Sequence, residues 1–190
     1  MKDQEKNRVP PGQRLVSNLP VLHYGKTWVI KKEEWTFRIF GLVDVETELS
    51  YDEFVSLPKF TLECDIHCVT GWSRLDAIWE GIKSTAIKDL VKISTDAKFV
   101  MVHAMGGFTT NLPIDEFFDD DVIFATHFEG IPITAEHGAP VRLVVPKLYF
   151  WKSAKWVTGV EFMEEDTMGF WENYGYHNHG DPWKQERYGY

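Results

Sequence analysis

The sequence predicts an α+β fold in which mixed β-sheets and a few short helices surround one core. Most apolar segments are brief and alternate apolar with polar residues, which is the pattern of a half-buried strand. The spacing typical of an amphipathic helix is confined to a few short stretches between those segments. A length of 190 residues without internal repeats suits a single domain.

The two ends of the chain differ in character from the domain between them. Residues 1–14 are charged and proline-bearing, which indicates a loose or surface-hugging N-terminal arm. A single domain is predicted for residues 15–190, and residues 169–190 form its aromatic C-terminal tail. We expect this tail to pack back over the domain, because its rings bury apolar area while keeping a polar handle.

Charge and hydropathy argue against several classes of partner. The formal net charge is −9, whereas a nucleic-acid partner requires a basic face. The sequence has no apolar run of about 18 residues, so no membrane span is predicted. The N-terminus lacks an apolar signal core and a twin-arginine pair, and the two cysteines fit a reducing compartment. We therefore expect a cytoplasmic protein.

The first half of the domain is predicted from local patterns. Residues 35–40 alternate at a period of two, which indicates a strand. Ser50 and Glu53 have the spacing of a capping box that opens a short helix, and Pro58 ends it. Residues 60–68 alternate again and predict a second strand.

The second half continues with short elements. Residues 84–91 place apolar side chains on one helical face. Residues 98–103 and 122–127 are predicted to be strands, and residues 109–113 a short extended segment. Residues 114–118 are expected to form a helical turn.

Both cysteines lie in the predicted strand 60–68. In an extended strand Cys64 and Cys68 share a face but lie roughly 13 Å apart, whereas a disulfide needs Cα atoms within about 7 Å. Cys64 is interpreted as a small buried hydrophobe. Cys68 ends the strand beside a Gly-Trp-Ser turn and Arg74, and a nearby cation would favour the thiolate that binds soft metals. A Cys-x3-Cys zinc half-site remains an alternative.

The residues from Cys68 to Ser73, Cys-Val-Thr-Gly-Trp-Ser, resemble the cysteine loop of the sulfite-oxidase superfamily of molybdenum enzymes. The resemblance is greatest to the branch with the catalytic subunit of the bacterial periplasmic methionine sulfoxide reductase, and it extends from Pro10 to Glu172. It implies the compact sulfite-oxidase fold, molybdenum and molybdopterin as cofactors, and Cys68 as the metal ligand. The implied activity is that of a molybdopterin-dependent oxidoreductase.

A second motif joins His137, Arg142 and the segment from Ser153 to Lys155. An arginine fork and a lysine point charge suit a phosphate monoester, although a strand pair with snorkelling cations has the same pattern. The family uses this motif to hold the pterin and its phosphate. The resemblance implies the following cofactor-binding residues: His23, Tyr24, Cys68, His103, His137, Arg142, Ser153, Ala154 and Lys155.

The aromatic tail supplies the candidates for the substrate wall. Trp171, Tyr174 and His177 join Cys68 as candidate catalytic residues, because the tail is expected to lie over the cofactor mouth. A zinc site through His177 and His179 lacks a third ligand of obvious spacing.

The expected reaction is a two-electron redox step or oxygen-atom transfer on a small sulfur- or nitrogen-containing molecule. Sulfite is less favoured, because sulfite oxidases carry an arginine in the early pterin segment and residues 21–25 contain no cation. No haem motif or iron–sulfur cysteine set is present, so an external electron donor or acceptor protein is implied. Two alternatives stay open, a non-catalytic molybdopterin-binding carrier and a zinc-stabilised interaction module using Cys64, Cys68 and the tail histidines.

Overall fold

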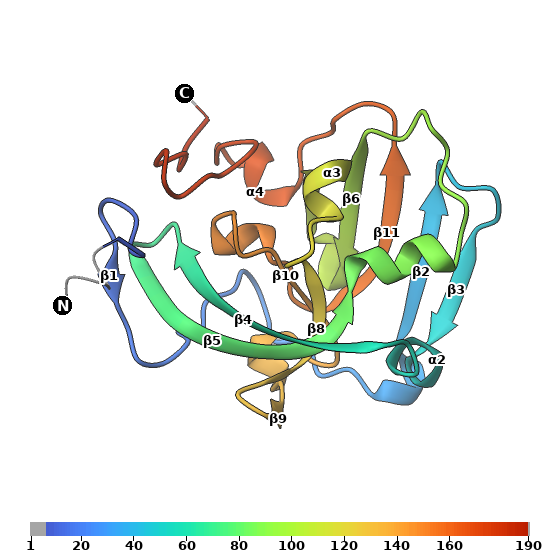
Figure 1. The fold of residues 1–190 in the computed structure, drawn as a ribbon, viewed down its shortest axis with the longest axis horizontal. Helices are drawn as coiled ribbons and strands as arrows, with labels where there is room; N and C mark the ends of the chain where they lie inside the picture. Colours follow the sequence, from blue (N-terminus) through green and yellow to red (C-terminus); the bar gives the residue numbers. More distant parts are fainter. Residues whose placement is uncertain (1–6, 190) are drawn as a thin grey trace.

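The computed structural model describes residues 7–189 and contains two β-sheets with short helices around them (Figure 1). The predicted α+β class is confirmed. The beginning of the predicted arm, residues 1–6, and Tyr190 at the end of the tail lie outside the described residues. Within the described residues, no helix is both long and apolar enough to cross a membrane.

The larger sheet carries the cysteine strand. It has six strands in the order β1-β5-β8-β10, with β4 paired to β5 and β9 paired to β8. The strands are β1 (Arg14–Leu15), β4 (Lys59–Cys68), β5 (Trp72–Lys83), β8 (Ile123–Phe128), β9 (Ile131–Pro132) and β10 (Arg142–Val144). The long strand β5 curves along the sheet (Figure 1). At its register shift, a Cβ on Gly81 would lie 2.0 Å from the Phe124 carbonyl oxygen, so the close approach of β8 requires glycine there.

The smaller sheet has five strands in the order β3-β2-β11-β6-β7. The strands are β2 (Thr36–Gly41), β3 (Thr47–Ser50), β6 (Phe99–Ala104), β7 (Thr109–Pro113) and β11 (Val157–Met163). β2 and β11 run parallel, and the other neighbours pair antiparallel. Because β6 and β4 belong to different sheets, the ends of strands 98–103 and 60–68 do not lie side by side as sheet neighbours.

Helical segments are short and connect the strands. The α-helices are α2 (Tyr51–Val55), α3 (Ile114–Phe117) and α4 (Phe170–Asn173). The 3-10 helices are η1 (Lys32–Glu34), η2 (Ser84–Asp89), η3 (Met105–Gly107), η4 (Ala135–His137) and η5 (Phe150–Lys152). The capping box is confirmed, since the Ser50 and Glu53 side chains each accept from the other residue's backbone N–H. The segment predicted as helix from 84 to 91 is a 3-10 helix that ends at Asp89.

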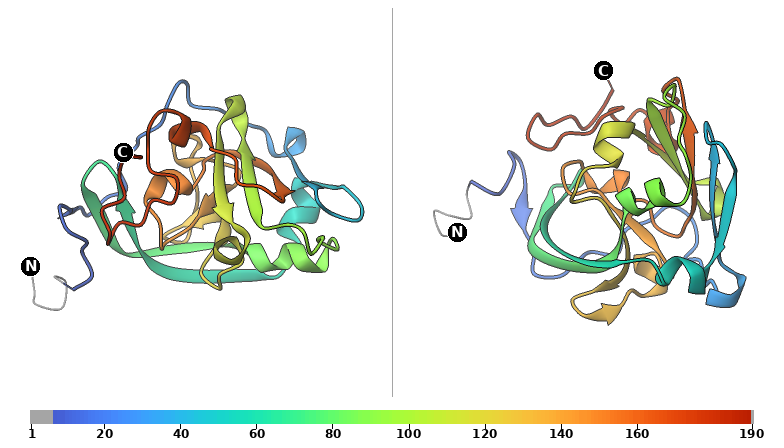
Figure 2. Two further views of the ribbon diagram at one scale, coloured as in Figure 1. Left: turned by 90° about the horizontal axis from the view of Figure 1, so that it is seen from above. Right: turned by 45° about the vertical axis from the view of Figure 1, so that its right-hand side comes forward.

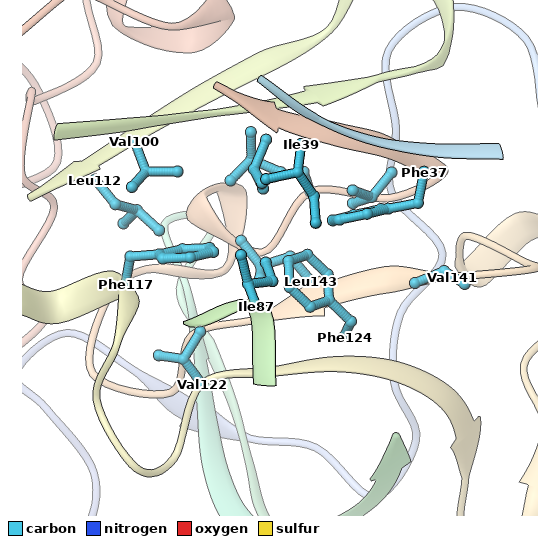
Figure 3. Close-up of a cluster of buried hydrophobic side chains, with 14 of the residues drawn as sticks. Phe37, Ile39, Ile87, Val100, Leu112, Phe117, Val122, Phe124, Val141 and Leu143 are labelled. Carbon is cyan, nitrogen blue, oxygen red and sulfur yellow. The ribbon is translucent and has the colours of Figure 1, made fainter. Parts of the chain in front are cut away.

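One large apolar cluster joins the two sheets. It contains Ile39 of β2 and Val100 of β6 from the smaller sheet, and Phe124 of β8 and Leu143 of β10 from the larger one (Figure 3). A second, smaller cluster lies at the β4–β5 end of the larger sheet and includes Cys68. The hairpin that carries Cys68 is therefore anchored in a core of its own.

The C-terminal segment folds back toward that hairpin. The left view in Figure 2 shows the C-terminal segment beside the tip of β4 and β5. A side-chain contact from Arg187 to the Val69 carbonyl establishes this proximity. The first and last described parts of the chain thus meet at the cysteine turn.

Candidate functional site

Cys68 lies at the tip of a β-hairpin. β4 ends at Cys68 and β5 begins at Trp72, which is its partner in the register. The Gly71 N–H donates to the Cys68 carbonyl over 2.9 Å, and Gly71 has a φ of +87°, which favours glycine. The tight turn places the Cys68 side chain in the wall of a cavity, where the residue is only 8% exposed.

The environment of the Cys68 thiol combines burial with nearby donors. Burial raises the pKa of Cys68, while hydrogen bonds from Thr70 and the charges of Arg187 and Lys155 act in the opposite direction. The Thr70 hydroxyl lies 3.2 Å from the sulfur. Arg74 does not contribute, because its guanidinium bonds to the Leu75 carbonyl and to Glu129. The cations that lower the pKa of Cys68 are therefore Arg187 and Lys155 and not Arg74 as predicted, and burial raises this pKa by more than they lower it.

The cavity beside Cys68 has a volume of about 420 Å³. Several chain segments that are far apart in sequence line it. They are the early segment with Leu22, His23, Tyr24 and Lys26, the cysteine hairpin with Thr70 and Trp72, the stretch from Arg142 through Ser153, Ala154 and Lys155, and the tail with Phe170, Trp171 and Tyr176. Its size and mainly apolar wall are typical of a small-molecule or cofactor site.

Arg142 lines this cavity and is fully buried. Its guanidinium donates to the carbonyls of His137 and Ser153, each over 3.0 Å, and lies 4.3 Å from the Phe150 ring centroid. Burial lowers the pKa of Arg142 to about 9, so the group remains a cation at neutral pH. With no carboxylate partner among residues 7–189, this is a buried positive charge compensated only by dipoles and rings.

Lys155 is the second cation of the cavity. Its Nζ donates to the Leu22 carbonyl over 3.0 Å and to the Glu136 carbonyl over 2.5 Å. Burial, followed by the charge of Arg142, lowers the pKa of Lys155 to about 7. A Cβ on Gly138, which has a φ of +107°, would lie 2.9 Å from the Lys155 Cβ and 3.1 Å from the Arg142 Cβ. Glycine at 138 is what allows both cation-bearing segments to pack against the turn.

Aromatic rings from opposite ends of the chain form the mouth of the cavity. Tyr24 contacts the rings of Phe170 and Trp171, with centroids 5.1 and 6.0 Å away. The His23 ring packs edge-on against Trp156 at 5.6 Å, and its Nε2 lies 3.1 Å from the Thr27 hydroxyl. The early segment and α4 thus build one aromatic wall.

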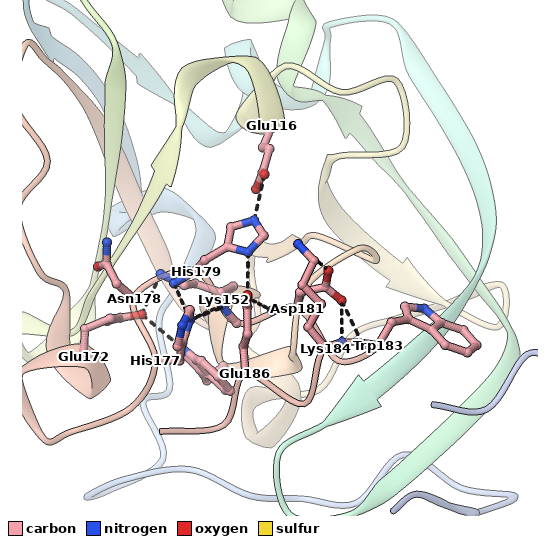
Figure 4. Close-up of polar contacts among 12 residues, drawn as sticks. Glu116, Lys152, Glu172, His177, Asn178, His179, Asp181, Trp183, Lys184 and Glu186 are labelled. Carbon is pink, nitrogen blue, oxygen red and sulfur yellow. Dashed lines mark hydrogen bonds and ion pairs between the residues drawn. The ribbon is translucent and has the colours of Figure 1, made fainter. Parts of the chain in front are cut away.

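Four of the predicted site residues do not line this cavity. His103 lies in a separate groove and is paired with Glu161 over 2.9 Å, because β6 belongs to the smaller sheet. Tyr174 is 64% exposed at the end of α4. His177 points into the tail, where its Nδ1 accepts the backbone N–H groups of residues 179 and 180 (Figure 4). His137 contributes its carbonyl to Arg142, and its buried Nδ1 has no partner among residues 7–189.

The structure also adds residues that the sequence patterns did not indicate. Trp72 lines the cavity, and its buried Nε1–H has no partner within the described chain. The Gln13 side chain donates to the Cys68 carbonyl over 3.0 Å, and Arg187 donates to the Val69 carbonyl. Trp72 belongs to the cysteine-loop motif and Gln13 lies in the stretch that resembles the family, but neither residue was assigned a role, and Arg187 lies beyond that stretch.

No group of three or more His, Cys, Asp or Glu side chains within residues 7–189 is placed to hold a metal ion. In the tail, His179 lies between two carboxylates, 2.8 Å from Glu116 and 2.8 Å from Glu186 (Figure 4). Cys64 and Cys68 lie on the hairpin instead, so the ligands of the zinc alternative are not gathered at one place.

Comparison with known proteins places this geometry in a family. The sequence profile of the family described as oxidoreductase molybdopterin binding domain matches residues 24–171. The chain is 43% identical over 188 residues to the protein described as uncharacterized oxidoreductase YuiH of Bacillus subtilis, covering 98% of this chain and 95% of that protein.

More distant relatives are longer than this chain. The catalytic subunit MsrP of the protein-methionine-sulfoxide reductase of Campylobacter jejuni is 29% identical over 78% of this chain, which spans 55% of that subunit. The crystal structure of the sulfane dehydrogenase SoxCD from Paracoccus pantotrophus superposes with a TM-score of 0.69 at 18% identity, covering 75% of this chain and 41% of the other. The chain thus spans about half the length of these two relatives, and the SoxCD likeness shows the fold.

Proposed function

The chain belongs to the oxidoreductase molybdopterin binding domain family, within the sulfite-oxidase-like superfamily, and on that premise we propose that Cys68 ligates molybdenum in its cavity. The protein is an enzyme of the oxidoreductase class. The main support for this proposal is that the thiol of Cys68 lines the same cavity as two cations, the buried Arg142 and the half-buried Lys155. A soft metal and a phosphate need these two kinds of group.

The residues in the cavity fit a molybdopterin cofactor. The Cys68 sulfur suits a soft metal, and the aromatic mouth suits a flat heterocycle. Arg142 and Lys155 offer positive charge to a phosphate, and the unpartnered Nε1–H of Trp72 is a buried donor that a polar ligand would satisfy. When bound, the cofactor supplies two-electron redox chemistry, while the chain supplies position and electrostatics.

Lys155 is proposed to hold the cofactor phosphate by direct hydrogen bonds. Arg142 is proposed to attract the same phosphate through its buried positive charge. The hydrogen bonds of the Lys155 ammonium to residues 7–189 go to two backbone carbonyls, so the ammonium can exchange these for phosphate oxygens. Arg142 is committed to the carbonyls of His137 and Ser153 and also shapes the turn that positions Lys155. The two cations therefore play different parts in the clamp.

Replacing Lys155 with alanine is expected to weaken cofactor retention without unfolding the protein. A charge-assisted hydrogen bond is worth about 1.5–3 kcal/mol, so the dissociation constant should rise roughly ten- to hundredfold. The measurement is the pterin content of wild type and variant after extended dialysis. Lys147→Ala, which removes an exposed lysine paired with Asp119, is the control. Equal retention in all three proteins would refute the role of Lys155.

We propose oxygen-atom transfer with a neutral sulfoxide or N-oxide, in preference to sulfite, as the reaction. Of the cavity's cations, Arg142 and Lys155 are bound to carbonyls, and Lys26 lies 3.9 Å over the Trp28 ring. Most of the remaining lining is aromatic or aliphatic, so a desolvated dianion would be poorly compensated. The relation to a protein described as a sulfoxide reductase supports the same direction. A separate electron-transfer protein is proposed as the redox partner.

Steady-state kinetics with an artificial electron donor or acceptor test this choice. Cofactor-loaded protein is expected to reduce sulfoxides or N-oxides with a higher kcat/KM than it oxidises sulfite, at one ionic strength. A sulfite kcat/KM above that of every sulfoxide and N-oxide tried would overturn the substrate proposal. Cofactor-loaded protein that turns over neither class would favour the carrier alternative.

A further inference from the structure

The cysteine turn is held from both ends of the chain. Two consecutive carbonyls, those of Cys68 and Val69, each accept a hydrogen bond from a distant side chain. Gln13, just before β1, donates to the Cys68 carbonyl over 3.0 Å, and Arg187, in the C-terminal tail, donates to the Val69 carbonyl. Neither residue lines the cavity, whereas the two residues that they contact, Cys68 and Val69, do.

Arg187 is itself held in place by packing and by the fold of the tail. Its guanidinium lies 5.1 Å from the Tyr149 ring centroid. Its backbone carbonyl accepts from the His177 N–H over 3.2 Å, which closes the loop of the tail. Gly12 also packs close to the guanidinium, since a Cβ at position 12 would lie 3.3 Å from the Arg187 Nη2. The arginine is therefore pre-set in its contact with the turn.

The charge of Arg187 acts on Cys68 from outside the cavity. Arg187 donates to the carbonyl of Val69, the residue next to Cys68, so its positive charge lies close to the proposed ligand. Lys155 is proposed above to be used by a phosphate, whereas Arg187 has no carboxylate partner among the described residues and its charge stays available. An uncompensated cation beside a redox-active metal favours the state with more electrons, because that state is the more negative one.

We propose that Arg187 is a positioning residue of the molybdenum site, which fixes the Cys68–Val69 turn and raises the reduction potential of the metal bound there. This inference rests on the proposed ligand role of Cys68. It makes the C-terminal tail part of the redox centre, because Arg187 contacts the carbonyl of Val69, a residue of the cavity wall, and Tyr176 of the tail lines the same cavity.

The test is a redox titration of the molybdenum signal by electron paramagnetic resonance in cofactor-loaded protein. Arg187→Gln is expected to lower the midpoint potential and broaden the signal. Arg187→Lys should lower the potential less, because lysine keeps the positive charge but lacks the planar guanidinium that contacts the Val69 carbonyl and the Tyr149 ring. Lys184→Gln is the matched control, since it removes a positive charge from the same tail at an exposed site paired with Asp181. A wild-type potential and line shape in Arg187→Gln would overturn the inference.

Hydrogen exchange on cofactor-free protein separates this inference from the proposed function. Faster exchange at the backbone amides of residues 69–71 is expected in Arg187→Gln and in Gln13→Ala, and unchanged exchange in Lys184→Gln. If Arg187→Gln exchanges like the wild type, the positioning role is wrong even if the metal site is right. If wild-type protein binds no molybdenum, the proposed function fails, and the effect on the metal potential fails with it.

Discussion

Replacing Cys68 with serine is expected to abolish molybdenum-dependent turnover while leaving a folded protein. A serine hydroxyl is a hard, neutral ligand where a soft metal needs a thiolate. Mutation of residues that merely hydrogen-bond to a metal ligand lowers metal affinity or activity about 10–100-fold, so removal of the ligand itself should lower activity further. Because Cys68 is buried in an apolar cluster, a small loss of thermal stability is also expected. The measurements are kcat and the melting temperature.

Cys64→Ser is the matched control for this variant. Cys64 lies on the same strand and packs against the same cluster, but it does not line the cavity. Burial, with neighbouring aspartates, strongly raises the pKa of Cys64, so it is an inert thiol. The Cys64→Ser variant should lose about as much thermal stability as Cys68→Ser, but it should still bind molybdenum and turn over substrate. Equal activity in Cys68→Ser and Cys64→Ser would remove Cys68 from the site.

Breaking the buried ion pair between Lys152 and Glu172 is expected to cost about 3–5 kcal/mol of folding free energy. The Lys152 Nζ lies 2.7 Å from Glu172 Oε1, and both side chains are 1% exposed. Asn111 accepts two further bonds from Lys152, and Trp151 donates to Glu172. Glu172→Ala would leave the ammonium buried without its counter-charge, a state that burial already disfavours by lowering the pKa of Lys152.

Urea denaturation of Glu172→Ala, Lys152→Met and the double variant measures this pair. The double variant should be more stable than the sum of the single losses implies, because no charge is then left unpaired. Lys98→Ala, which breaks an exposed pair with Glu164, should cost less than about 1 kcal/mol. Since Glu172 lies on α4, its loss should also loosen Trp171 in the cavity wall and raise KM. Additive single losses would show that the pair is not coupled.

Local sequence patterns were sufficient where neighbours along the chain determine the structure. The alternation of residues 35–40 and the capping box at Ser50 reflect contacts within a few residues, and both elements form as expected. The hairpin tip after Cys68 follows in the same way, because Gly71 permits the tight turn at a strand end.

Other features depend on which strands become neighbours, which local patterns do not determine. His103 was expected near the cofactor, but strand pairing places β6 in the smaller sheet and its histidine in another groove. Arg142 was expected as a guanidinium fork for a phosphate, and the structure adds that this guanidinium is buried and donates to backbone carbonyls of distant residues. The contact of Arg187 with Val69 joins distant residues, so no spacing in the sequence could indicate it.

Molybdenum X-ray absorption on cofactor-loaded wild type and Cys68→Ser tests directly whether Cys68 ligates molybdenum. The cavity brings one protein thiol, that of Cys68, to the proposed metal position. The wild-type metal is expected to have about one more sulfur neighbour than the metal in the serine variant. An absence of molybdenum from wild-type protein made in a host that supplies the cofactor, or an equal sulfur signal in the two proteins, would contradict it.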